Sequence, residues 1–174
     1  YRSKFMIAFD DVTFDFRGKS LLITGASSGI FQVVAEAYGK AGAKVAICDI
    51  NKEGAEVTKT AIKSHGGSAE FYHCDVSQVG TIINCVKTVL SDFGKIDVLI
   101  NGAGIVYREK AETYPDDKWD LVINTHARGT FLMCREVGRH MIERGKGGKI
   151  VNTSSMLAWS GGFLVSSYAS AKGA

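Results

Sequence analysis

The sequence predicts an α/β fold built on a doubly wound parallel sheet of the Rossmann type. Short apolar runs alternate along the chain with longer segments whose apolar residues recur at the helical period. Runs that are apolar on both faces are typical of parallel strands, which helices cover on both sides. Because crossovers between parallel strands are right-handed, ligands of such a sheet bind at the carboxyl ends of its strands.

Five apolar runs bordered by glycine or polar residues are expected as strands: 20–24, 44–49, 69–74, 96–101 and 148–153. Helices are expected over 29–40, 51–64, 77–93 and 116–144, the last one in one or two pieces, and from 166 onward. Gly42 follows the first helix and Gly66-Gly67 ends the second, while Asn51 caps the second at its start. The segment before the first strand, 1–18, is a lead-in, and 1–174 is expected to form a single domain.

A turn with two glycines joins the first strand to the first helix over residues 24–30. Such glycines let the backbone turn sharply and bring amides and the helix N-terminus against a pyrophosphate. The alternative is an ordinary connection between a strand and a helix. Asp49 ends the second strand roughly 20 residues later, where an acid accepts hydrogen bonds from a ribose diol and repels a 2′-phosphate. The turn has no lysine or arginine, so the sequence favours NAD over NADP; Asp49 as a cap of the next helix is the alternative.

Tyr168 and Lys172 lie four residues apart on a predicted helix, so their side chains share a face. An ammonium group beside a phenol stabilises the phenolate and lowers the tyrosine pKa from about 10, which makes the tyrosine a better base. A solvated surface pair is the alternative. Ser155 precedes Tyr168 by thirteen residues, just past the fifth strand, where its hydroxyl can bind a substrate oxygen; Ser154 competes for this role.

Together these motifs resemble those of the short-chain dehydrogenase/reductases over about residues 15–174. The resemblance rests on Thr24-Gly25-x-x-x-Gly29, Asp75-Val76, Asn101-Gly102-Ala103-Gly104, Asn124, Ser155 and Tyr168-x-x-x-Lys172. It implies an NAD-dependent oxidoreductase in which Tyr168 takes the alcohol proton while a hydride passes to nicotinamide, and Ser155 positions the oxygen. It also implies that Lys172 binds the nicotinamide ribose and that Asn124 holds a water linking Lys172 to solvent; a polar residue bonded within its own helix is the alternative for Asn124.

The resemblance further implies a set of cofactor-binding residues: Gly25, Ser27, Ser28, Gly29, Ile30, Asp49, Asp75, Val76, Asn101, Ala103, Gly104, Tyr168 and Lys172. One departure is Phe31, because the family usually has glycine at that position. A phenylalanine there would crowd the cofactor, shift the helix or fill a pocket that glycine leaves open. The family fold continues beyond Ala174, so a truncated sheet with one bare edge is expected, in a chain that forms homodimers or homotetramers.

Within the family, residues 105–172 are similar to the sugar-acid dehydrogenases that act on deoxy-gluconates. Arg108 could pair with a substrate carboxylate, or with Glu109 as a solvated surface pair. Trp159 and Phe163 would line the substrate pocket or simply pack. A catalytically impaired nucleotide-binding or interaction protein of the same family is the alternative function.

Composition limits the other classes of function. A net charge of +3 without a clustered basic face gives no support for a nucleic-acid partner, and no apolar run approaches the ~20 residues of a membrane span. The cysteines have no metal-ligand spacing, so free thiols, no metal site and a cytoplasmic location are expected. The histidines have no partners at catalytic spacing and receive no role: His65, His73, His126 and His140.

Overall fold

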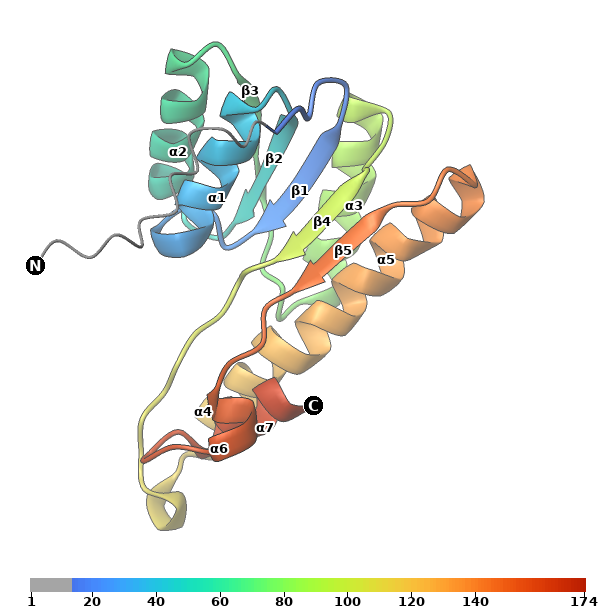
Figure 1. Ribbon diagram of the computed structural model, residues 1–174. Helices are drawn as coiled ribbons and strands as arrows, with labels where there is room; N and C mark the ends of the chain where they lie inside the picture. Colours follow the sequence, from blue (N-terminus) through green and yellow to red (C-terminus); the bar gives the residue numbers. More distant parts are fainter. Residues whose placement is uncertain (1–13) are drawn as a thin grey trace, which may run out of the picture.

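The computed structural model describes residues 14–174, which form a parallel five-stranded sheet in the order β3-β2-β1-β4-β5 (Figure 1). The strands are β1 (Ser20–Thr24), β2 (Lys44–Asp49), β3 (Ser68–His73), β4 (Val98–Asn101) and β5 (Lys149–Asn152). The longer helices are α1 (Gly29–Lys40), α2 (Lys52–Ser64), α3 (Val79–Phe93), α4 (Asp116–Ile123), α5 (Gly129–Arg144) and α7 (Ser166–Gly173). Three short elements complete the set: η2 (Ala111–Thr113), the π-helical turn η3 (Asn124–Arg128) and α6 (Leu157–Ser160). This arrangement confirms the doubly wound sheet, and the lead-in over 1–13 lies outside the described residues.

Helices cover both faces of the sheet, as the apolar strands predict (Figure 1). Leu21 and Ile23 of β1 pack on one face in a cluster with residues of α1 and α2. Leu22, between them, points to the other face and packs in a cluster with residues of α3 and α5. Both faces of β1 are therefore buried, which is why its sequence is apolar throughout.

The first two helices begin and end where the sequence predicts. The side chain of Asn51 accepts a hydrogen bond from the amide of Gly54 at 3.1 Å and so caps α2. Gly42, just past α1, has a φ of +94°, in the region that glycine adopts without strain. Helix α3 begins at Val79, two residues after the predicted start at Ser77. The amide and hydroxyl of Ser77 instead both donate to Asp75 Oδ1, at 2.9 and 2.7 Å.

The bounds of three strands differ slightly from those predicted from the sequence. The third lies one residue earlier than expected, β5 is shorter at both ends, and β4 begins at Val98. Residues 96–97 precede β4, and the Asp97 carboxylate binds groups outside this strand. This carboxylate accepts from the amide of Ser20 at 3.0 Å and pairs with Lys95 and Arg144 at 2.9 and 2.8 Å. This cluster lies at the end of the sheet opposite the site described below.

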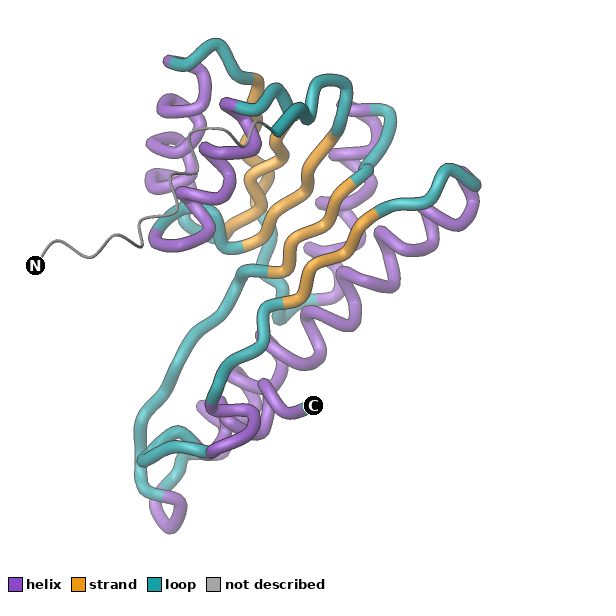
Figure 2. The backbone as a smooth tube through the Cα atoms, in the orientation of Figure 1, coloured by secondary structure: helices purple, strands orange, loops and turns teal. Residues whose placement is uncertain are grey.

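The long helix predicted over 116–144 is two helices, α4 and α5, joined by η3. A π-turn places an extra residue in the helix and is often found at functional sites. Beyond the carboxyl ends of β4 and β5, two loops run side by side away from the sheet, to the region of α4, α6 and α7 (Figure 2). Among the described residues, β5 is an edge strand and its side chains are exposed. In this part of the chain, no helix has the length and apolar character to cross a membrane, and no cluster of potential metal ligands occurs.

Candidate functional site

A cavity of about 460 Å³ opens at the carboxyl ends of β1, β2, β3 and β4. Its wall contains nine of the residues expected to bind a cofactor: Gly25, Ser27, Ser28, Ile30, Asp49, Asp75, Val76, Ala103 and Gly104. Four others from the same expectation do not line it: Gly29, Asn101, Tyr168 and Lys172. The structure adds Gly102, Ile105 and Thr125, which belong to the loop after β4 and to η3. We call this space the nucleotide cavity.

The turn between β1 and α1 requires both of its glycines. Gly25 has a φ of +73°, and a Cβ atom there would lie 2.6 Å from the Cα atom of Ala103. The turn therefore packs backbone against backbone with the loop after β4. Gly29, the first residue of α1, has a φ of +62°. Ser28 gives α1 no side-chain cap, so the first amides of this helix remain open to an anion.

Asp49 is 9% exposed and holds two segments of the nucleotide cavity together. Its Oδ2 atom accepts from the amide of Ser27 at 3.1 Å, and its Oδ1 atom accepts from the amide of Asn51 at 2.9 Å. Because each carboxylate oxygen has a second lone pair, Asp49 can still accept hydrogen bonds from a ligand. The residue that caps α2 is Asn51, so Asp49 supports that cap without being the cap itself.

Phe31 also lies in the wall of the nucleotide cavity. Its ring covers Gly102, where a Cβ atom would lie 2.4–2.6 Å from three ring carbons. Helix α1 is unbroken from Gly29 to Lys40, and Phe31 packs against the core cluster beneath it. The ring therefore lies between Gly102 and the space of the nucleotide cavity.

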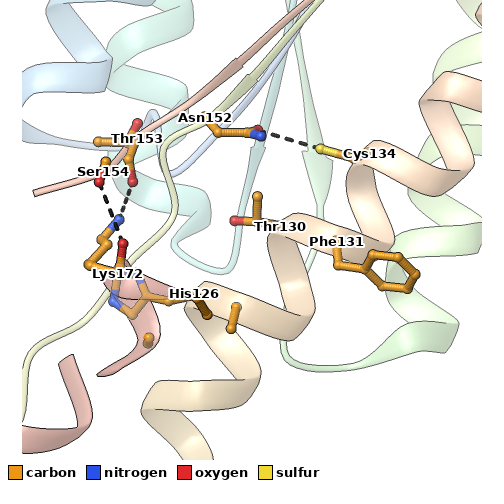
Figure 3. A pocket seen from close by; sticks show the side chains of 11 residues that line it. His126, Thr130, Phe131, Cys134, Asn152, Thr153, Ser154 and Lys172 are labelled. Carbon is orange, nitrogen blue, oxygen red and sulfur yellow. Dashed lines mark hydrogen bonds between the residues drawn. The ribbon is translucent and has the colours of Figure 1, made fainter. Parts of the chain in front are cut away.

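A second cavity, also of about 460 Å³, lies between the end of β5, α5 and α7 (Figure 3). Lys172 lies in its wall and donates a hydrogen bond from Nζ to the carbonyl oxygen of Thr153, at 2.5 Å. Partial burial lowers the pKa of Lys172 below its ordinary value. The same Nζ atom is 5.7 Å from the centre of the Tyr168 ring, so the two side chains share a face of α7. We call this space the lysine cavity.

Three further candidate site residues, Ser155, Ser154 and Asn124, differ in their relation to the two cavities. The hydroxyl of Ser155 accepts a hydrogen bond from the amide of Leu157 at 3.2 Å, at the start of α6, and Ser155 lines neither cavity. Ser154, its competitor, lines the lysine cavity, and its hydroxyl donates to the carbonyl oxygen of Lys172 at 3.5 Å. Asn124 begins η3 and lines neither cavity.

The residues expected at the substrate are exposed: Trp159 lies in α6, whereas Arg108 and Phe163 lie in loops. Arg108 is exposed, and Glu109 accepts from the amide of Lys110 and the hydroxyl of Thr113, so the structure contradicts a pair of Arg108 with Glu109. Trp159 and Phe163 are 93% and 82% exposed, so they do not pack within the described residues.

His126 has no role in the sequence-based prediction, yet the structure places its imidazole among the site residues. His126 is buried and lines the lysine cavity. Its ring meets that of Tyr168 edge-on, with 5.0 Å between the centres. Burial, and secondarily the charge of Lys172, lower the pKa of His126. No spacing along the chain could reveal this, because its neighbours come from the loop after β4 and from α7.

Consecutive residues of η3 line the two cavities: Thr125 lines the nucleotide cavity, which also contains Asp49, and His126 lines the lysine cavity, which also contains Lys172. Three comparisons with known proteins agree with this geometry. The family model described as short chain dehydrogenase matches residues 19–174.

Two relatives are sugar or polyol dehydrogenases by name. The chain is 41% identical to D-threitol dehydrogenase of Mycolicibacterium smegmatis over 149 residues, which are 84% of this chain and 57% of that protein. It is 37% identical to 2-dehydro-3-deoxy-D-gluconate 5-dehydrogenase of Pseudoalteromonas atlantica over 163 residues, which are 92% of this chain and 63% of that protein. The chain thus spans roughly three fifths of the length of these relatives.

One solved structure has a similar fold. NAD+-bound xylitol dehydrogenase superposes with a TM-score of 0.86 at 34% identity, covering 91% of this chain and 61% of that one. The family match takes in all five strands, both cavities and the helix that carries Tyr168 and Lys172. From its sequence and its fold, this chain belongs to the short-chain dehydrogenase family.

Proposed function

We propose that this protein is an NAD-dependent oxidoreductase that interconverts a secondary alcohol and a ketone on a sugar acid or polyol. The observation that carries the proposal is that consecutive residues of η3 line two cavities, of which one contains Asp49 and the other Lys172. A dinucleotide has an adenosine ribose at one end, which suits Asp49, and a nicotinamide ribose at the other, which suits Lys172.

The residues of the nucleotide cavity fit such a cofactor. A side chain at Gly25 would collide with the loop after β4, so the backbone here is open to a close approach. The uncapped N-terminus of α1 favours a pyrophosphate. The Asp49 carboxylate suits a free ribose diol and disfavours a 2′-phosphate, which supports NAD over NADP. Asp75 and Val76 would hold the adenine.

When bound, the nicotinamide supplies the group that accepts or donates a hydride. In the oxidation direction, the phenolate oxygen of Tyr168 takes the alcohol proton as the substrate C–H hydride leaves; in reduction Tyr168 returns that proton. Lys172 keeps its ammonium near Tyr168 and favours the phenolate. Ser155 would bind the substrate oxygen once the amide of Leu157 shares its hydroxyl, and Ser154 is the nearer serine to Lys172.

The substrate class follows from the named relatives and from Arg108. A polyol and a keto-deoxy sugar acid are the substrates in the two relatives' names. Arg108 is exposed on the loop after β4 and unpaired with Glu109, so it is available to a carboxylate. We therefore favour a sugar acid.

We also propose a cytoplasmic homo-oligomer. The buried thiols of Cys48 and Cys85 lie 3.4 Å apart without a disulfide, which suits a reducing compartment. On α5, Phe131 and Ile142 are 62% and 82% exposed, and apolar side chains of this kind favour an interface between subunits.

The test is turnover by the purified protein with a panel of sugar acids and polyols, beside the Tyr168→Phe variant. Loss of a positioned acid–base group costs about 10²–10⁴-fold in kcat. Tyr38→Phe is the matched control, because Tyr38 stacks on Phe16 at the far face of the sheet, 4.5 Å between ring centres. Retention of most turnover in Tyr168→Phe would refute the mechanism. Binding of NADH without turnover on any substrate would favour a catalytically silent nucleotide-binding protein.

A further inference from the structure

His126 is held in place by the loop that follows β4. Its Nε2 atom lies 2.7 Å from the carbonyl oxygen of Ile105 and 3.0 Å from the amide nitrogen of Ile105. A Cβ atom at Gly104 would lie 2.4 Å from Cε1 of the ring, so the loop passes directly over the imidazole. The Ile105 amide donates to Nε2 when Nδ1 carries the hydrogen; in the other neutral tautomer, which the shorter contact favours, Nε2 carries the hydrogen and donates it to the carbonyl oxygen.

In that tautomer the other ring nitrogen, Nδ1, is an acceptor, and the structure gives it no partner although it is fully buried. His126 itself is 5% exposed. A buried polar atom without a hydrogen bond costs about 1–3 kcal/mol, so such atoms usually serve a ligand, a water or a proton. The ring forms part of the wall of the lysine cavity, on the same side as Lys172 and Ser154 (Figure 3).

Few other charges surround His126. From α7 it faces Lys172 and Tyr168, and from α5 the thiol of Cys134 lines the same cavity. The loop after β4 offers only backbone at Gly104 and Ile105. Among the described residues, no aspartate or glutamate side chain lines the lysine cavity to compensate a second positive charge beside Lys172.

We propose that His126 is a positioning residue for the Tyr168–Lys172 pair, and that it holds the pair in place only while its imidazole is neutral. The neutral ring donates to Ile105, supports the edge of Tyr168 and leaves Nδ1 as an acceptor without a partner. Protonation would fill Nδ1 with a hydrogen and place a cation beside the ammonium of Lys172. This repulsion would displace the pair from its working position. The inference rests on the proposed function for its kinetic consequence but not for its structural one.

The kinetic test uses the pH profile of kcat in the direction of ketone reduction. In that direction Tyr168 must be protonated, so its own ionisation produces only an alkaline limb. A fall in kcat of tenfold or more on the acid side, with an apparent pKa below about 6.5, is therefore expected from His126. His126→Asn should remove this limb, because a carboxamide can pair with the backbone of Ile105 and does not titrate.

Two further variants complete the kinetic test. His126→Ala should lower kcat tenfold or more at every pH while changing the Kd for NADH less than threefold. His140→Asn is the matched control, since His140 accepts from the amide of Ile96 at 3.3 Å, remote from the cavity, and should leave the profile unchanged. An acid limb that persists in His126→Asn, or full activity of His126→Ala, would overturn the proposal.

NMR titration of the imidazole decides the question even if the protein shows no turnover. The nitrogen shifts should show a hydrogen on Nε2 and none on Nδ1, and the ring resonances of Tyr168 should move as His126 titrates. Lys172→Met should raise the pKa of His126. If the Tyr168 ring resonances do not move as His126 titrates, or if the pKa of His126 is unchanged in Lys172→Met, the positioning role is refuted independently of the proposed function.

Discussion

Asp49→Asn tests two proposed roles of one carboxylate: it bonds backbone amides and it selects the cofactor. The variant keeps the shape of the side chain and loses its charge. Asp49 accepts hydrogen bonds from the amides of Ser27 and Asn51 through different oxygens, at 3.1 and 2.9 Å. Asparagine has only one oxygen, so one of these two amides, buried at Ser27 and partly buried at Asn51, loses its partner. Leaving a buried donor unsatisfied costs about 1–3 kcal/mol, which lowers Tm by about 2–12 °C in a protein of this size.

The same change should alter the choice of cofactor. A neutral amide oxygen is a weaker acceptor than a carboxylate by about 1 kcal/mol, which weakens binding of the ribose diol of NADH. Loss of the negative charge also removes repulsion of the 2′-phosphate of NADPH, worth about 1 kcal/mol or more at a partly buried site. Together, about 2 kcal/mol should shift the ratio of the two dissociation constants roughly 30-fold toward NADPH.

The assay is fluorescence titration of wild type and variant with NADH and NADPH, alongside thermal unfolding. Asp97→Asn is the matched control, because Asp97 also accepts from a backbone amide, that of Ser20, but at the opposite end of the sheet. It should lower Tm and leave the NADH to NADPH ratio within twofold. If Asp49→Asn lowers Tm with an equally unchanged ratio, Asp49 serves the turn alone and the argument for NAD fails.

Gly102→Ala would drive a Cβ atom into the ring of Phe31, so it should destabilise the protein by about 1–3 kcal/mol in urea unfolding. Phe31→Ala should relieve the clash, and a double-mutant cycle with additive effects would show that the ring does not cover Gly102. The ion pairs of Asp97 lower its pKa from 3.8 to about 2, so their stabilisation is complete above about pH 4 and is lost as pH falls through about 2. Asp97→Asn should therefore flatten the dependence of stability on pH between 4 and 2, and an equal slope in both proteins would contradict this. Arg108→Leu should raise KM for sugar acids tenfold or more and leave KM for polyols within twofold; equal effects on both classes would remove the carboxylate contact.

The sheet could be predicted from sequence because its inner strands β1, β2 and β4 are buried on both faces and each connection is helical. The errors occurred where side chains replace backbone partners. The apolar run predicts a strand from Ile96, but the Asp97 carboxylate accepts from the amide of Ser20 and β4 begins two residues later, at Val98. Likewise Ser77 bonds back to Asp75 and does not begin α3. Neither bond has a signature in hydrophobic periodicity.

Most of the nucleotide cavity was predictable for a related reason. Its residues stand at strand ends, and parallel strands bring those ends together whatever the details of packing. The lysine cavity depends instead on how α5, α7 and the end of β5 pack, which no local pattern specifies. Ser155 thus proved to be bonded at the start of α6, whereas Ser154 lines the cavity.

The π-turn η3 explains why no role for His126 could be predicted from the sequence and why its imidazole lines the lysine cavity. An extra residue in one turn shifts the phase of the helix, so a periodic pattern drawn from α4 no longer describes α5. The shift lets the consecutive residues Thr125 and His126 be buried against two different cavities. It also brings Gly129 so close to the loop after β3 that a Cβ atom there would lie 2.7 Å from the carbonyl oxygen of Val76. The turn thereby fixes the position of His126 relative to the cofactor side, and Gly129→Ala should disturb both cavities together.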